Sequence, residues 1–273
     1  MRIGSAIRGV ARRTTELPGV RHALKALYER RFVREKPRTN LYRGVFPTFA
    51  DALANVPSSR PLGYDHAATA AMYRDRTRRV YISDYPLLFW MRTLFESGCA
   101  SVFDLGGHIG IGYYAYQRYL RYPPALRWLV HDVPAVITSG REWADQNDPE
   151  RRLAFTSRRE DAEGMDLLFA SGSLQYLDYT LADLLAPMAR RPAHLLINLL
   201  PVHMSLSYFT VQNMGAAYCP YRISAEPAFL GGLRELGYVL KDRWENPDRR
   251  CEIPHHRGYS LDRYFGYYLA RQE

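Results

Sequence analysis

The chain of 273 residues contains only three cysteines and no long apolar run. Cys99, Cys219 and Cys251 are odd in number and lack the short spacing of metal ligands, so we expect packing roles, without a disulfide framework or a metal site. No run reaches the roughly 18 apolar residues of a membrane-spanning helix, and the N-terminus lacks the apolar core of a signal peptide. We therefore expect a globular protein that stays in the cytoplasm.

Positive charge is concentrated at one end of the chain. Residues 1–43 hold 12 Lys/Arg against 3 Asp/Glu, and this excess equals the formal net charge of +9 of the whole protein. The remaining 230 residues are therefore formally neutral. A protein that tracks nucleic-acid phosphates needs a basic face on its main domain, so we expect no nucleic-acid partner.

The basic segment reads as two amphipathic helices interrupted at Leu17-Pro18-Gly19. In each half, apolar residues recur at helical spacing and are flanked by Lys and Arg, as for Val20, Leu24, Leu27 and Tyr28. Such a segment either packs on its own domain or contacts an anionic membrane. The second alternative predicts peripheral contact through residues 1–36 at the inner membrane face. We predict that residues 1–40 are dispensable for cofactor binding.

From residue 99 onward, short apolar runs alternate with amphipathic segments of about ten residues. This alternation predicts a parallel, doubly wound Rossmann-like α/β sheet, and the last two strands, 238–244 and 263–270, should pair antiparallel at its edge. Expected strands lie at 100–105, 126–132, 153–157, 165–171 and 193–200, with helices at 112–121, 134–145, 182–188 and 228–236.

Three regions follow from these patterns. We expect a basic amphipathic tail at 1–43, an N-terminal helical lead-in at 44–98 and the main α/β domain at 99–273. Residues 198–224 show no regular pattern, so we expect a long loop that serves as a lid.

The stretch SVFDLGGHIGIGYY, Ser101 to Tyr114, lies at the end of the first parallel strand, where ligands of doubly wound sheets bind. Its glycines allow a sharp turn and a close approach of the backbone to a ligand, but their spacing does not match the GxGxxG dinucleotide pattern. Asp104 precedes the first glycine by two residues. A carboxylate there repels a pyrophosphate and attracts an ammonium or sulfonium group.

A second carboxylate, Asp132, ends the next predicted strand in LRWLVHDVP. At this position a carboxylate accepts hydrogen bonds from both ribose hydroxyls. The alternative for each aspartate alone is helix capping. Together, Asp104 and Asp132 predict a pocket for S-adenosyl-L-methionine.

The chain resembles class I S-adenosylmethionine-dependent methyltransferases, and more closely a family often encoded beside bacterial surface-polysaccharide genes. The motifs that carry the resemblance are GVFPTFADALA, VFDLGGHIG, WLVHDVP, DLLFASGSLQYLD and TVQNMGAAYCPYRIS, spread over residues 42–270. The resemblance implies methyl transfer to a small-molecule or glycan acceptor in polysaccharide biosynthesis. The cofactor-binding residues that it implies, together with those argued above, are Asp104, Gly106, Gly107, His108, Gly110, Asp132, Ser171, Gly172, Ser173 and Gln175.

Several positions depart from the usual methyltransferase pattern. His108 stands where glycine is common, and Gln175 stands where some O-methyltransferases carry a catalytic histidine. An amide cannot act as a general base near neutral pH. His203, just beyond the fifth strand, is therefore our candidate catalytic base, although alignment alone suffices for an acceptor that is already nucleophilic.

These departures leave alternative functions open. A catalytically inactive binding protein with the methyltransferase fold is one alternative, motivated by His108, Gln175 and Asn198. A nucleic-acid methyltransferase is a weaker one, because its catalytic tetrad or cysteine motif is absent from the sequence. Neither the chemical nature of the acceptor nor the oligomeric state follows from the sequence.

Overall fold

The computed structural model describes residues 18–34, 37, 39–65 and 74–272. Its main body is a seven-stranded sheet with the strand order β10-β11-β6-β5-β2-β3-β4. The five consecutive strands from β6 to β4 run parallel, and β11 runs antiparallel to both β6 and β10. The predicted doubly wound sheet with a final antiparallel strand is therefore confirmed. The strands are β2 (Ser101–Leu105), β3 (Arg127–His131), β4 (Leu153–Thr156), β5 (Leu167–Ser171), β6 (His194–Leu200), β10 (Tyr238–Asn246) and β11 (Tyr264–Arg271).

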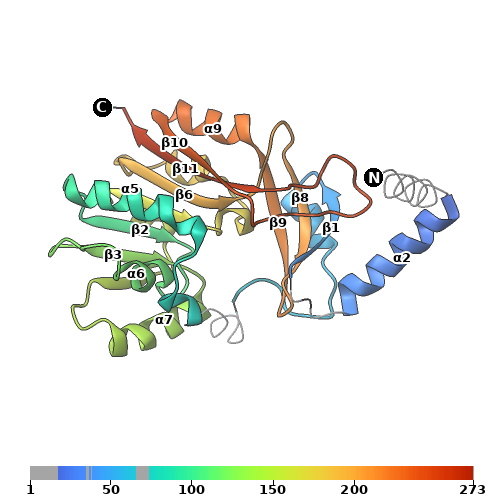
Figure 1. Cartoon of the computed structure of the whole chain (residues 1–273), viewed down its shortest axis with the longest axis horizontal. Helices are drawn as coiled ribbons and strands as arrows, with labels where there is room; N and C mark the ends of the chain where they lie inside the picture. Colours follow the sequence, from blue (N-terminus) through green and yellow to red (C-terminus); the bar gives the residue numbers. More distant parts are fainter. Residues whose placement is uncertain (1–17, 35–36, 38, 66–73, 273) are drawn as a thin grey trace, which may run out of the picture.

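Helices cover both faces of this sheet (Figure 1). One face packs against residues of α5 and α6, including Met91 and Tyr113, and the other packs against α8 and α9, including Leu184 and Leu233. The alternation of apolar strands with amphipathic helices made this layering predictable. The helices of the main body are α5 (Tyr85–Glu96), α6 (Ile111–Tyr116), α7 (Pro134–Asn147), α8 (Leu181–Leu185) and α9 (Glu226–Glu235), with short 3-10 turns η1 (Arg74–Arg78), η2 (Ile82–Asp84), η3 (Arg159–Ala162) and η4 (Leu174–Tyr176).

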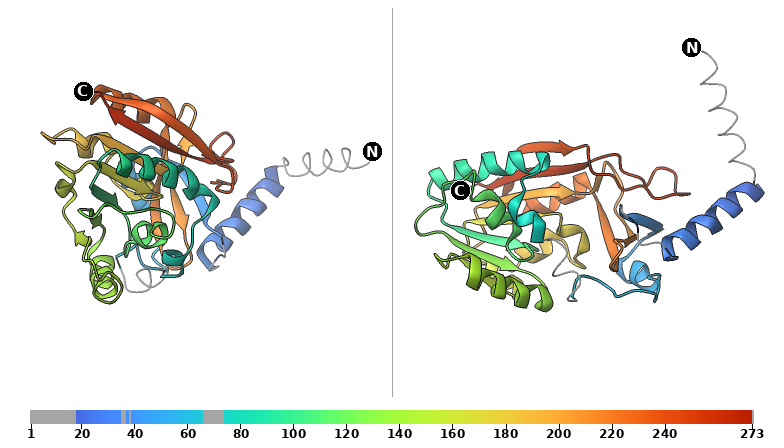
Figure 2. Two further views of the ribbon diagram at one scale, coloured as in Figure 1. Left: turned by 60° about the vertical axis from the view of Figure 1, so that its left-hand side comes forward. Right: turned by 60° about the horizontal axis from the view of Figure 1, so that its bottom comes forward.

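A second, four-stranded sheet lies beside the first, with the order β1-β8-β9-β7 (Figures 1 and 2). The prediction of a long loop at 198–224 is wrong, because this segment forms most of that sheet. All six residues of β8 are buried, so the strand shows no alternation of apolar and polar residues. The strands are β1 (Leu41–Phe46), β7 (Val202–His203), β8 (Tyr208–Asn213) and β9 (Tyr218–Ala225).

The N-terminal region contributes to this second sheet. Strand β1 spans the expected boundary between residues 43 and 44 and pairs antiparallel with β8. The lead-in also contains α3 (Phe49–Ala54), which begins with a Thr48 side-chain cap. Its other helical elements are η1, η2 and α5, whereas residues 66–73 lie outside the described residues.

Of the two predicted basic helices, the second is α2 (Pro18–Arg34), while residues 1–17 lie outside the described residues. The C-terminal half of α2 packs on the second sheet. Phe32 is fully buried and stacks on Tyr218 with ring centroids 5.5 Å apart, and the Tyr28 hydroxyl donates to the Tyr42 carbonyl oxygen at 2.7 Å. Leu27 is instead 65% exposed. None of the described helices is long and apolar enough to cross a membrane.

Candidate functional site

The glycine turn after β2 folds tightly over its own strand. Gly106 has a φ of +77°, and a methyl group there would lie 2.4 Å from the Ser173 Cβ. A methyl group on Gly107 would lie 2.3 Å from the Asp104 carboxyl carbon. Both distances are well inside van der Waals contact, so only glycine fits at either position. The turn therefore brings its backbone against Asp104 from β2 and Ser173 from the segment after β5.

Asp104 lies beneath this turn with 1% of its surface exposed. The Trp128 indole Nε1 donates to its Oδ2 at 3.0 Å, which satisfies one lone pair of the carboxyl group. Burial raises the pKa of Asp104 to about 7, against the lowering effect of the Trp128 hydrogen bond. A cationic ligand group beside Asp104 would favour its ionised form, so the site is suited to an ammonium.

Asp132, at the end of β3, ties that strand to the glycine turn. Its Oδ2 accepts the main-chain N–H of His108 at 2.9 Å, and its Oδ1 accepts that of Val133 at 2.8 Å. Burial raises the pKa of Asp132 to about 6, while these two hydrogen bonds oppose the increase. Each carboxylate oxygen keeps a second lone pair, so Asp132 can still accept two hydroxyl groups.

His108 stands at the position where glycine is common, and its backbone has the left-handed conformation that favours glycine. Its φ is +57°, a left-handed conformation that is uncommon for residues other than glycine and that histidine, asparagine and aspartate adopt more often than the rest. The side chain is buried, with 6% of the residue exposed. The nearby Gly110 has a φ of +87° and precedes the first turn of α6. The departure from glycine is thus accommodated in the backbone, and the main-chain N–H of His108 still points to Asp132.

The predicted residues after β5 lie against the glycine turn. Ser173 Oγ donates a short hydrogen bond to the Leu105 carbonyl oxygen, and the Gly172 N–H donates to the Asn198 carbonyl oxygen at 2.9 Å. Gln175 is buried, and among the described residues its Oε1 has no hydrogen-bond partner. The strand order reverses between β2 and β5, so this junction is the point at which doubly wound sheets bind ligands.

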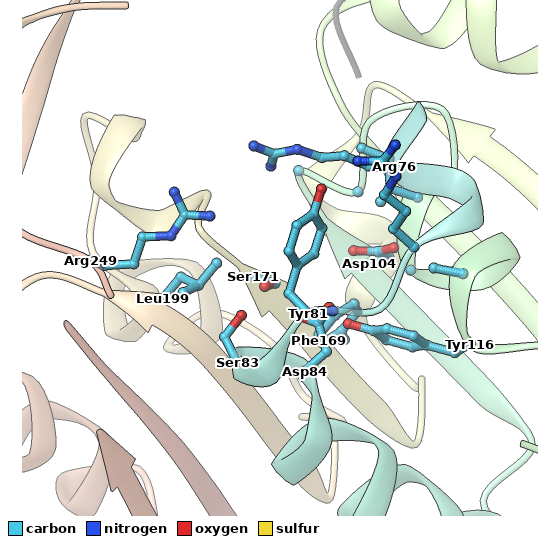
Figure 3. Close-up of a pocket in the computed structure, with 16 residues that line it drawn as sticks. Arg76, Tyr81, Ser83, Asp84, Asp104, Tyr116, Phe169, Ser171, Leu199 and Arg249 are labelled. Atoms are coloured by element: carbon cyan, nitrogen blue, oxygen red, sulfur yellow. The ribbon is translucent and has the colours of Figure 1, made fainter. Parts of the chain in front are cut away.

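A pocket open to solvent lies at this junction (Figure 3). Of the predicted cofactor residues, the pocket is lined by Asp104, Gly106, Gly107 and Ser171. The others stand behind or beside this lining. They are His108, Gly110, Asp132, Gly172, Ser173 and Gln175.

Sequence reasoning missed a second carboxylate in the pocket, Asp84 of η2. It is 8% exposed, its Oδ2 accepts the Tyr81 N–H at 2.8 Å, and burial raises its pKa. In the sequence Asp84 appeared only as part of the interruption before Pro86. The visible signal was an aspartate just ahead of a helix, which more often indicates a cap.

Three arginines that sequence reasoning also missed line the same pocket: Arg76, Arg79 and Arg249. They come from η1, from the segment after it, and from the connection between β10 and β11. Among the described residues, neither Arg79 nor Arg249 forms an ion pair or a side-chain hydrogen bond. The pocket thus holds carboxylates at its base and guanidinium groups around them.

Asn198, at the end of β6, connects three of the segments that form the pocket. Its Nδ2 donates to the Ser83 carbonyl oxygen at 2.9 Å, and its Oδ1 accepts from Trp244 Nε1 at 3.0 Å and from Asn246 Nδ2 at 3.1 Å. The residue is 1% exposed. The next residue, Leu199, lines the pocket with a φ of +53°. Asn198 therefore acts as a structural junction, with its side-chain amide committed to these contacts.

The structure places His203 outside the lining of this pocket. Its Nδ1 accepts the N–H groups of Ser205 at 3.1 Å and Leu206 at 3.0 Å. Nε2 lies 2.9 Å from the Gly258 carbonyl oxygen, so it is the protonated nitrogen. Both ring nitrogens are occupied by the main chain, and the predicted role of His203 as the catalytic base is not supported by this geometry.

No family model matches the chain, and no curated protein matches it. Among solved structures it is similar to the mitomycin 7-O-methyltransferase MmcR, with 16% identity over 64% of this chain and 50% of that one and a TM-score of 0.42. The chain thus spans half the length of MmcR.

Two further solved structures are similar. The 1,6-didemethyltoxoflavin-N1-methyltransferase of Burkholderia thailandensis is 16% identical over 76% of this chain and 80% of that one, with a TM-score of 0.43. An S-adenosylmethionine-dependent methyltransferase from Mesorhizobium loti is 15% identical over 69% of this chain and 98% of that one, with a TM-score of 0.45. At this degree of similarity, function has to be argued from the site itself.

Proposed function

We propose that the protein is an S-adenosyl-L-methionine-dependent methyltransferase that acts on a small-molecule or glycan acceptor. The observation that carries this proposal is the arrangement of Asp104 and Asp132 around one glycine turn at the reversal point of the sheet. Asp104 lies under the turn, and Asp132 holds the turn from the neighbouring strand. This spacing suits a ligand with a cationic amino-acid end and a ribose.

The residues present fit the charges of this cofactor. Asp104 would hold the ammonium group of the methionine portion, and Arg76 and Arg79 would hold its carboxylate. Asp132 would accept hydrogen bonds from the ribose hydroxyls, with the N–H groups of His108 and Val133 keeping it oriented. When bound, S-adenosylmethionine supplies an electrophilic methyl group on a sulfonium.

We assign the proton-accepting role to Asp84 in place of His203. Asp84 is a buried carboxylate that lines the pocket, and its raised pKa makes it a better base than an exposed aspartate. Replacement by asparagine preserves its size and removes its basicity. We expect Asp84→Asn to reduce turnover at least a hundredfold while changing S-adenosylhomocysteine affinity by less than about threefold. A large loss of cofactor affinity would instead assign Asp84 to cofactor binding.

The experiment that tests the proposal is calorimetric titration with S-adenosylhomocysteine, followed by assays of methyl transfer to candidate acceptors. Cofactor binding with no transfer to any carbohydrate or small aromatic acceptor would favour the inactive binding protein. Transfer to RNA or DNA would favour the nucleic-acid alternative, which the neutral charge of residues 44–273 makes less suitable. The glycan acceptor and its place in surface-polysaccharide synthesis rest on the sequence resemblance.

We further propose that the basic tail brings the protein to an anionic membrane surface at the cytoplasmic side. Leu24 and Leu27 are exposed on α2, and Lys25, Arg30 and Arg31 are exposed on the same helix. Each basic residue near such a surface contributes about 1 kcal/mol. Sedimentation with anionic and neutral vesicles tests this proposal. Equal recovery of the protein on both vesicle types would favour the alternative that the tail packs on its own domain.

A further inference from the structure

We infer that the acceptor carries an anionic oxygen group, a carboxylate or a phosphate, and that Arg249 binds it. This inference rests on the proposed function. It concerns Arg249, the arginine of the pocket lining that has no assigned role in binding the cofactor. Arg249 lies on the side of the pocket formed by Leu199 and Ser171, whereas Asp104, Tyr116 and Arg76 lie on the other side of Tyr81 (Figure 3). In this view Arg249 and Arg76 thus lie on different sides of Tyr81.

The backbone holds Arg249 in place before any ligand arrives. Its N–H donates to the Asn246 carbonyl oxygen at 3.2 Å, which closes a turn with Pro247 at the favoured second position. The Asn246 side chain is 3% exposed and is bonded to Asn198. The turn thus fixes the main chain from which the Arg249 side chain extends to the pocket lining.

Arg249 makes no direct polar contact through its side chain in the pocket. Among the described residues it forms no ion pair or side-chain hydrogen bond, and its electrostatic partner is the Asp84 carboxyl group, which also interacts with Arg76. A bound cofactor would bring a sulfonium cation into the same pocket. Together with Arg76, Arg79 and Arg249, this cation exceeds the negative charge that Asp84 and Asp104 can supply, and an acidic acceptor would offset the excess.

The neighbouring side chains match the remainder of such an acceptor. Leu199 offers an apolar surface, and its left-handed backbone conformation turns it into the pocket lining. Tyr81 offers an aromatic face and a hydroxyl, which suit a sugar or a ring. Arg249 would thus fix the acidic group while the body of the acceptor lies between Leu199 and Tyr81.

Calorimetry with small anions on the S-adenosylhomocysteine complex tests this inference. The bound cofactor product occupies Arg76 and Arg79 through its own carboxylate, so added inorganic phosphate reports on the remaining cation. We expect millimolar phosphate binding that weakens at least fivefold in Arg249→Ala and is unchanged in Arg250→Ala, an exposed neighbour outside the pocket lining. Acetate in a parallel titration distinguishes the sources, because tighter acetate binding indicates a carboxylate on the acceptor and tighter phosphate binding a phosphate.

The outcomes separate this inference from the proposed function. If S-adenosylhomocysteine binds equally to the wild type and Arg249→Ala but neither anion binds the complex, the inference is wrong and the proposed function stands. Equal weakening of anion binding in Arg249→Ala and Arg250→Ala would also overturn it. Failure of the wild type to bind S-adenosylhomocysteine would reject the proposed function, and this inference with it.

Discussion

The side-chain amide of Asn198 donates a 2.9 Å hydrogen bond to the main-chain carbonyl oxygen of Ser83. This contact joins the end of β6 to η2, and therefore holds Asp84 beside Leu199 in the pocket lining. It crosses 115 residues of sequence. The geometry of the pocket thus depends on a buried polar contact that carries no catalytic chemistry.

Replacing Asn198 by alanine should lower the free energy of unfolding by about 2 to 4 kcal/mol. The change removes three hydrogen bonds and leaves the buried donors of Trp244 and Asn246 without their acceptor. Chemical denaturation measures the loss. Asn147→Ala is the control, because the exposed Asn147 bonds only a carbonyl of its own helix and should change stability by about 0.5 kcal/mol or less. A similar loss of unfolding free energy in both variants would argue against a structural role of Asn198 in joining β6, η2 and β10.

Gly107→Ala should weaken cofactor binding, because the new methyl group would meet the Asp104 carboxyl group 2.3 Å away. Either the turn or Asp104 must then move. Calorimetry with S-adenosylhomocysteine should show affinity at least tenfold weaker. Gly231→Ala is the matched control, since a Cβ there meets nothing within 4 Å and the helical site of α9 should gain about 0.5 to 1 kcal/mol of stability. Unchanged affinity in Gly107→Ala would contradict the assigned role of the turn.

S-adenosylhomocysteine affinity should increase with pH between about 5.5 and 8. Asp104 has a pKa of about 7 when the protein is folded, and the ligand ammonium favours its ionised form. Below that pKa, binding must displace a proton, which costs about tenfold in affinity per pH unit. In Asp104→Asn the affinity should fall, and the remaining pH dependence should shift towards the pKa of Asp132, about 6. A profile that is identical in the variant would exclude Asp104 as the titrating group.

The same carboxyl group should affect the stability of the unliganded protein in the opposite direction. The folded state holds the Asp104 proton up to a pKa of about 7, whereas the ordinary value is 3.8. Between these values the folded state binds more protons than the unfolded state, so stability falls as pH rises from about 4 to 7. Denaturation curves across this range should show a shallower fall in Asp104→Asn. An equal fall in both proteins would contradict the raised pKa.

Deleting residues 1–36 should destabilise the second sheet, whereas deleting residues 1–17 should not. The longer deletion removes Phe32, whose ring is fully buried against Tyr218, and the loss of such a ring costs about 3 to 5 kcal/mol. This prediction concerns stability, and the expectation that residues 1–40 are dispensable for cofactor binding stays a separate prediction. Thermal unfolding of both truncations, with Phe32→Ala as a point-variant reference, measures the effect. A 1–36 deletion as stable as the full chain would show that Phe32 contributes little.

The main sheet could be predicted from the sequence because its signals are local. Each parallel strand is a short apolar run, and Asp104 and Asp132 end two of them, so strand order alone brought both to one edge. Strand β8 was missed because burial on both faces removes the alternation that would identify it. Asp84 and Arg249 were missed because only tertiary contacts, such as those of Asn198, bring η2 and the β10–β11 connection to the pocket. The main-chain contacts of His203 with Ser205, Leu206 and Gly258 could likewise not be read from the sequence.

The central claim is that Asp132 and the glycine turn bind the adenosyl cofactor, and one calorimetric comparison tests it most directly. Titration of the wild type with S-adenosylhomocysteine should give saturable binding, and Asp132→Ala should weaken it at least tenfold. The variant loses the ribose acceptor and also the partner of the His108 and Val133 N–H groups. Absence of binding by the wild type, equal affinity in the folded variant, or tighter binding of a nicotinamide dinucleotide would contradict the claim.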